Sequence, residues 1–84
     1  MPRWLRRRAF PDVPMVTLRL WRSDAIVLFD WLNTTDMDSV PISHRAEKQA
    51  LTDLLNAMER DVFHDVTQIE IDEAREQVAR DMGW

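Results

Sequence analysis

The sequence predicts a small α+β domain that is mostly α, with one N-terminal β-strand followed by three helices. Apolar and polar residues alternate from Met15 to Arg22, which is typical of a half-buried strand. Residues 25–32 are apolar on nearly every side. Two later segments, 43–61 and 67–82, repeat apolar residues at the three- and four-residue spacing of amphipathic helices. These three patterns define the expected fold class.

The predicted strand, residues 15–22, has an apolar face and a mixed face, because side chains on a strand point alternately to its two sides. The apolar face carries Val16, Leu18 and Leu20, and the mixed face carries Thr17, Arg19 and Trp21. An unpaired strand edge is a liability that proteins cover. This strand can therefore pair antiparallel with the same strand of a second copy, which would give a homodimer.

The first predicted helix covers residues 24–33, with Ser23 as its N-cap and Asp24 at its positive end. Between residues 25 and 32 only Asp30 is charged. A helix with one face in water carries polar residues on that face, so we expect this helix to be covered on two sides. A chain of 84 residues has little material for two covers. The pattern therefore predicts self-association or a bound partner.

Asp30 and Trp21 each allow two interpretations. A charge removed from water must be paired or hydrogen-bonded. In one interpretation Asp30 marks an interface and is paired with Arg19 or Arg22 of the same or a neighbouring chain. In the other it lies along a narrow solvent-exposed strip of the helix. Tryptophan is enriched at interface hot spots, which favours Trp21 as an interface residue. The alternative is that the third helix or Trp84 covers it within one chain.

The second predicted helix follows a polar connection that ends at Pro41, and it runs from its cap Ser43 to about Asp61. Its apolar stripe consists of Ala50, Leu51, Leu54, Leu55, Met58 and Val62. The spacing of this stripe is that of an ordinary amphipathic helix.

The third predicted helix starts at Thr67, because Thr67 and Glu70 have the spacing of a capping box. Gly83 stands where a C-terminal cap belongs. The competing interpretation makes residues 66–71 a second short strand, since apolar and polar residues alternate there.

Charge divides the chain into a basic arm, residues 1–14, and an acidic globular domain, residues 15–84. The arm has four arginines and one aspartate, a net charge of +3, and the domain has 7 basic and 14 acidic residues, a net charge of −7. We expect the arm to be a disordered tail, or else an electrostatic arm for phosphate, RNA or a membrane surface. A sequence without cysteine agrees with a cytoplasmic protein. Its apolar runs fall far short of the roughly 20 residues of a transmembrane segment.

No pattern typical of catalysis is present, and we expect no enzymatic activity, no cofactor and no metal. The single glycine is next to the last residue, which excludes a glycine-rich phosphate loop. Asp61, His64 and Asp65 have metal-ligand side chains, but a closed zinc site uses four ligands and the chain has two histidines and no cysteine. Asp36 and Asp38 lie in a polar connection, where solvated carboxylates are common.

The order of strand, helix and helix, with a strand edge free for a twofold partner, resembles the ribbon-helix-helix arrangement. The segments are VTLRLWRS for the ribbon, DAIVLFDWLN for the first helix and SHRAEKQALTDLL for the second. The resemblance implies that Thr17, Arg19 and Trp21 face DNA bases and that Ser43 contacts the phosphate backbone. The chain departs from that family in its long connection, residues 33–42, and in its acidic domain.

A second resemblance covers residues 15–81. The segments RSDAIVLFDWL, AEKQALTDLLNAMER and EAREQVARD resemble a group of small uncharacterised bacterial proteins. Those proteins have an acidic cap, an ALVLFEWL-like helix, a second helix of the pattern AE…AL…L…LE and a closing helix that contains AR. This resemblance implies no activity.

The sequence thus predicts a small, non-enzymatic protein-interaction module that is homodimeric through its strand and first helix. The expected interface residues are Val16, Leu18, Trp21, Phe29, Asp30 and Trp31. One alternative is a ribbon-type DNA-binding repressor or antitoxin, with Thr17, Arg19 and Ser43 as nucleic-acid contacts. The other is an acidic immunity or antitoxin partner that covers a basic surface of another protein. The expected partner is a second copy or another protein, ahead of nucleic acid.

Overall fold

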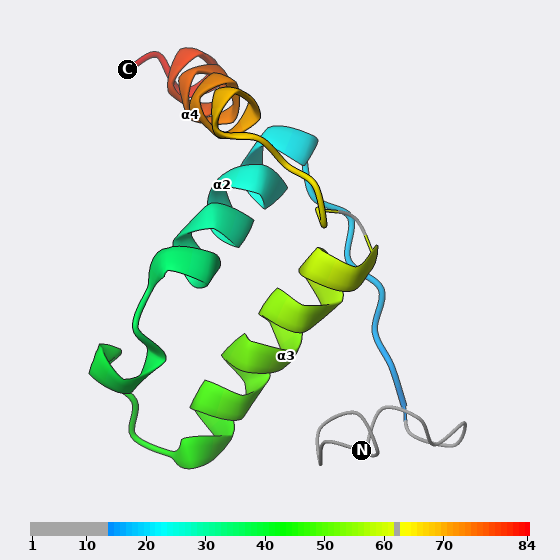
Figure 1. The fold of residues 1–84 in the computed structure, drawn as a ribbon, viewed down its shortest axis with the longest axis vertical. Coiled ribbons are helices and arrows are strands. Elements are labelled where there is room, and N and C mark those ends of the chain that lie inside the picture. Colours follow the sequence, from blue (N-terminus) through cyan, green and yellow to red (C-terminus); the bar gives the residue numbers. More distant parts are fainter. Residues whose placement is uncertain (1–13, 62) are drawn as a thin grey trace.

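The computed structural model describes residues 14–61 and 63–84, which form three α-helices and one short 3₁₀-helix (Figure 1). In chain order the elements are α2 (Arg22–Thr34), η1 (Met37–Ser39), α3 (Arg45–Asp61) and α4 (Gln68–Met82). The predicted arm, apart from Pro14, and the predicted stripe residue Val62 lie outside the described residues.

The predicted fold class is wrong, because the described residues contain no β-strand and the fold is all-α rather than α+β. Residues 14–21, the region of the expected strand, run as extended chain into α2 (Figure 1). A strand is stabilised by hydrogen bonds and side-chain pairs with a neighbouring strand. The other segment with strand-like alternation, residues 66–71, leads into α4 instead. Within the described part of the chain, the alternation of residues 15–22 therefore has no strand to pair with.

α2 begins two residues earlier than predicted and is not capped by Ser23. The Ala25 N–H donates to the Trp21 carbonyl at 3.0 Å, which starts the helical hydrogen bonds at Trp21 and places Ser23 inside the first turn. The Trp21 side chain makes no capping hydrogen bond. Asp24 lies in the first turn as predicted, where the helix dipole favours a carboxylate. The start of α2 is thus set by backbone hydrogen bonds rather than by a side-chain cap.

α3 begins at Arg45, two residues after its predicted cap Ser43. The Glu47 carboxylate accepts hydrogen bonds from the Ser43 hydroxyl at 2.8 Å, the Ser43 N–H at 3.1 Å and the His44 N–H at 2.8 Å. His44 Nδ1 accepts from the Ala46 N–H at 3.0 Å. The polar groups at this helix start are therefore satisfied by Glu47 and His44, and Ser43 acts as a donor rather than as the cap.

The prediction for α4 is confirmed. The Thr67 hydroxyl accepts from the Glu70 N–H at 3.2 Å, which is half of the expected capping box. Gly83 adopts the left-handed conformation, with φ of 74°, and its N–H donates to the Arg80 carbonyl at 3.1 Å. A positive φ is easy only for glycine. Because residues 68–82 are helical, the competing strand over residues 66–71 is excluded.

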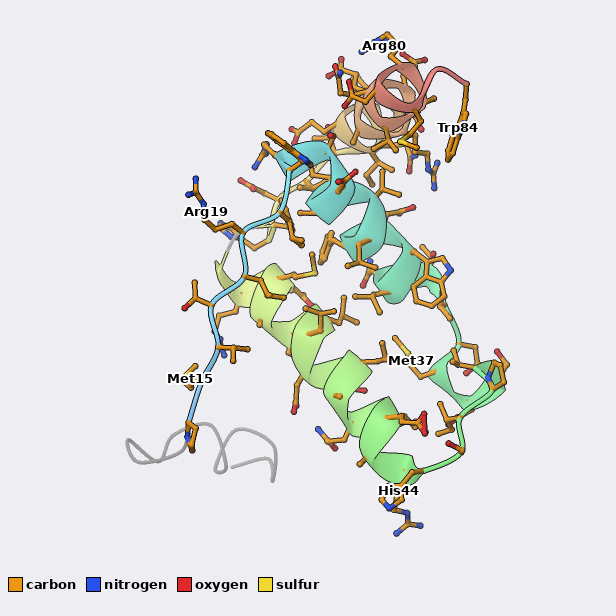
Figure 2. The ribbon with its side chains drawn as sticks, turned by 180° about the vertical axis from the view of Figure 1, so that it is seen from behind. Met15, Arg19, Met37, His44, Arg80 and Trp84 are labelled. Atoms are coloured by element: carbon orange, nitrogen blue, oxygen red, sulfur yellow. The ribbon has the colours of Figure 1, made fainter. Side chains whose placement is uncertain are left out.

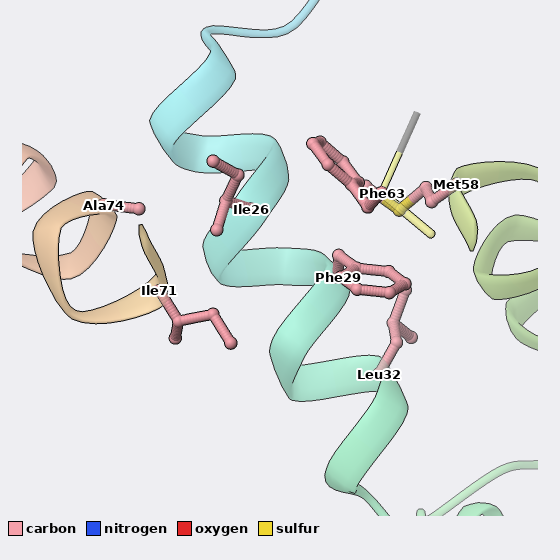
Figure 3. Close-up of a cluster of buried hydrophobic side chains, with 7 residues drawn as sticks. All are labelled: Ile26, Phe29, Leu32, Met58, Phe63, Ile71 and Ala74. Carbon is pink, nitrogen blue, oxygen red and sulfur yellow. The ribbon is translucent and has the colours of Figure 1, made fainter. Parts of the chain in front are cut away.

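The core places α2 between α3 and α4. Its buried side chains are Ile26, Phe29 and Leu32 from α2, Met58 from α3, Phe63 from the α3–α4 connection, and Ile71 and Ala74 from α4. Figure 3 shows Ile71 and Ala74 on one side of α2, with Met58 and Phe63 on the other. The rings of Phe29 and Phe63 are packed with centroids 5.3 Å apart. The chain itself therefore supplies both covers of α2, which by itself requires neither a second copy nor a partner.

Candidate interaction surface

Large apolar side chains lie exposed on the residues that lead into α2. We call residues 15–21 the extended segment. Its exposed apolar residues are Met15, Val16, Leu18, Leu20 and Trp21. Their exposed fractions range from 53% for Leu20 to 88% for Val16. Figure 2 shows Met15 and Arg19 on this segment, with the Arg19 side chain directed away from the helices. The segment therefore offers apolar surface to another molecule.

The predicted interface residues fall into two groups. Val16, Leu18 and Trp21 share the extended segment, and all three are exposed. On α2, Trp31 is 48% exposed, whereas Phe29 is buried in the core. Trp21 is 81% exposed, so neither α4 nor any other described part of the chain covers it as the alternative interpretation required.

Asp30 joins α2 to α4 within one chain. Its carboxylate lies 2.6 Å from a guanidinium nitrogen of Arg75, with the Asp30 side chain 14% exposed. Neither expected partner takes this role, because Arg19 forms no ion pair with a described residue and Arg22 lies 4.0 Å from Glu70. Asp30 is thus a paired, mostly buried charge, and its partner Arg75 was not among those predicted from the sequence.

An open groove of about 670 Å³ lies between the first turn of α2 and one side of α4. We call it the acidic groove. Its apolar lining includes the buried Ile26 and Ala74 and the exposed Trp21. Its charged lining comprises four carboxylates and two guanidinium groups, from Glu70, Glu73, Glu76, Asp81, Arg22 and Arg80. The groove therefore combines apolar surface with an excess of negative charge.

The two arginines of the acidic groove already face carboxylates of the same lining. Arg22 lies 4.0 Å from Glu70, and Arg80 lies 3.9 Å from Glu76. Glu73 forms no ion pair with any residue that the structure describes. Clustered charge of one sign in a concave surface attracts ligands of the opposite sign. The electrostatics of this groove therefore favour a cation.

The predicted nucleic-acid contacts do not form one site. Thr17 and Arg19 are exposed on the extended segment, while Ser43 precedes α3. Figure 2 shows Arg19 and His44, the neighbour of Ser43, toward opposite ends of α3. The Ser43 N–H and hydroxyl both donate to the Glu47 carboxylate, so a phosphate there would lose these donors and meet a negative charge.

Among the side chains that the structure describes, no group of three or more histidine, cysteine, aspartate or glutamate residues could hold a metal ion. The side chain of Asp61, one of the three candidate ligands, is outside that set. Within the described residues, no helix is long and apolar enough to cross a membrane.

Comparisons with protein-family models, with curated proteins and with solved structures find no match to this chain.

The acidic groove was not among the sites predicted from the sequence. Glu70, Glu73, Glu76 and Gln77 recur at three- and four-residue spacing along α4, so an acidic helix face could have been identified from the sequence. That spacing does not reveal that the face lies beside the first turn of α2. The groove exists only because α4 crosses α2 near its N-terminal end (Figure 1).

Proposed function

We propose that this protein is a small, non-enzymatic interaction module that forms a homodimer through the extended segment. The observation that supports the proposal is the exposure of five large apolar side chains within seven consecutive residues, 15–21. Single exposed apolar side chains are normal on a monomer, whereas contiguous apolar surface is typical of interaction sites. The contact that we propose is one between side chains, since the described residues contain no strand.

The size of this surface suits a dimer. Trp21, which is 81% exposed, by itself offers on the order of 150 Å², and the four exposed aliphatic side chains add to this area. A stable interface buries about 800 Å² per partner. The apolar residues of the extended segment thus supply a substantial part of the required area, and Arg19 with other neighbours can supply the remainder. Trp21 is the natural anchor, because tryptophan is enriched among hot spots.

Ribbon-type DNA binding is less favoured. The residues expected to form the ribbon form no strand in the described chain, and Ser43 is engaged by Glu47. The proposal places the module in the cytoplasm, an assignment based on the absence of cysteine. The relation to small bacterial proteins with an ALVLFEWL-like helix stays a hypothesis that the residues of α2 motivate.

Light scattering after size-exclusion chromatography tests the proposal on the full chain over a dilution series. We expect a dimer that dissociates on dilution. Leu18→Glu should raise its Kd at least about 30-fold, because losing a hot-spot contact costs about 2 kcal/mol or more. Ile69→Glu is the matched control, since Ile69 is 70% exposed on α4, outside the extended segment. A monomer at every concentration, or equal effects of the two substitutions, would refute the proposal.

A further inference from the structure

One residue of the acidic groove lies close in sequence to the N-terminal start of the described residues. Trp21 lines the groove, and the described residues begin only seven positions earlier, at Pro14. The groove calls for a ligand that is cationic and partly apolar, because its lining has excess carboxylates around Ile26 and Ala74. The groove shares Trp21 with the extended segment, whereas its carboxylates and the buried Ile26 and Ala74 lie outside the proposed dimer contact.

The first 13 residues, MPRWLRRRAFPDV, have the chemistry that this groove favours. They contain four arginines against one aspartate, with Trp4, Leu5 and Phe10 interleaved among them. Guanidinium groups pair well with carboxylates through several donors. Arginine and tryptophan side chains also cover apolar surface with their stems and rings. Charge complementarity therefore favours these residues as the occupant of the groove.

The length of the chain permits the same molecule to supply this occupant. Seven residues from Trp21 to Pro14 span at most about 25 Å, and the 13 residues before Pro14 span up to about 45 Å. These two spans are long enough for residues 3–8 to reach back to the groove beside Trp21. A covalently attached ligand has an effective concentration in the millimolar range. The chain's own arm thus has an advantage over the arm of a second copy.

We propose that the acidic groove between α2 and α4 binds the basic arm of its own chain, with residues 3–8 as the bound segment. The arginines face the carboxylates of Glu73, Glu76 and Asp81, and the apolar side chains of the arm lie against Ile26 and Ala74.

A spin label on the arm tests this proposal in the full chain. The sequence has no cysteine, so Ala9→Cys carries a nitroxide at one position. The ¹⁵N amide signals of Glu73 and Ala74 should lose intensity when label and isotope are in the same molecule, and regain it in 1 M salt, where screening is strong. They should keep full intensity when ¹⁵N chains without label are mixed with labelled ¹⁴N chains. An intensity loss that also appears in the mixed sample would overturn the proposal, because the bound arm would then belong to a second copy.

Charge reversal provides the specificity control. Glu73→Lys with Glu76→Lys should abolish the intensity loss, and changing arginines 6–8 to glutamate in that background should restore it. Glu59→Lys with Asp65→Lys reverses two exposed charges outside the groove and should leave the loss unchanged. The proposal would be refuted if the starting protein showed no intensity loss, or if Glu73→Lys with Glu76→Lys left the intensity loss unchanged. Because this readout is intramolecular, it also distinguishes arm binding from dimer formation, which Leu18→Glu disrupts separately.

Discussion

The same substitution at two leucines provides a sharp test of how the chain divides its apolar residues. Leu32, on α2, is 1% exposed and is the largest fully buried side chain among the described residues. Leu18, on the extended segment, is 73% exposed. We expect Leu32→Ala to be strongly destabilising and Leu18→Ala to be nearly neutral for folding, because only Leu32 loses contacts within the chain.

The expected cost at Leu32 follows from its burial. The substitution removes three carbon atoms, worth about 0.8 kcal/mol each in transfer free energy, or about 2.4 kcal/mol. The cavity that remains between α2 and α3 adds to this, so the total is about 3–4 kcal/mol. A domain of this length has a stability of roughly 4–13 kcal/mol. The substitution should therefore remove a large part of the stability, whereas surface changes such as Leu18→Ala stay within about 0.5 kcal/mol.

Urea unfolding followed by far-UV circular dichroism measures both costs. With a slope of about 1–1.5 kcal/mol/M for a small protein, the midpoint of Leu32→Ala should fall by about 2 M or more. The measurement belongs at a concentration where light scattering shows a monomer, so that dimer formation does not contribute. A loss below about 1 kcal/mol at Leu32, or an equal loss at Leu18, would contradict the burial of α2 described above.

Three further predictions concern local contacts. Thr67→Ala removes the α4 cap and should cost about 1 kcal/mol in urea unfolding; no change would mean that the cap is not formed. A double-mutant cycle of Asp30→Asn and Arg75→Gln should give a coupling on the order of 1 kcal/mol, and additivity would refute the α2–α4 bridge. Hydrogen bonds from Ser43 hold the pKa of the Glu47 carboxyl below its ordinary value. The stabilising effect of the ionised Glu47 carboxylate is complete above about pH 4.3 and is lost as pH falls through the lowered pKa. The free energies of unfolding of Glu47→Gln and of the parent chain should therefore become equal in acid, which acid unfolding measures.

Helix boundaries were predictable where the signal is local. The start of α4 at Thr67 and its end at Gly83 depend on residues within one or two turns, and both predictions are confirmed. The start of α2 was predicted two residues too late, because Ser23 is a good cap by type but the helix begins at Arg22 without a side-chain cap. A preferred residue type thus indicates a helix start without fixing it.

The extended segment shows where a pattern is insufficient. The alternation of Val16, Leu18 and Leu20 is typical of a strand, yet a strand also needs a neighbour for its hydrogen bonds. No other described segment provides one. What remains of that pattern is a row of exposed apolar side chains, and it supports the dimer proposal without supporting the predicted fold class.

The sequence by itself determined that α2 is covered on two sides, because apolar residues surround nearly its whole circumference. Only the tertiary structure decided what covers it: Met58 and Phe63 on one side, Ile71 and Ala74 on the other. Hydrophobic burial is non-directional, so a pattern of apolar residues states that surface must be covered without naming the cover. The pairing of Asp30 with Arg75, 45 residues away, likewise depends on how α4 crosses α2. The acidic groove arises from that same crossing.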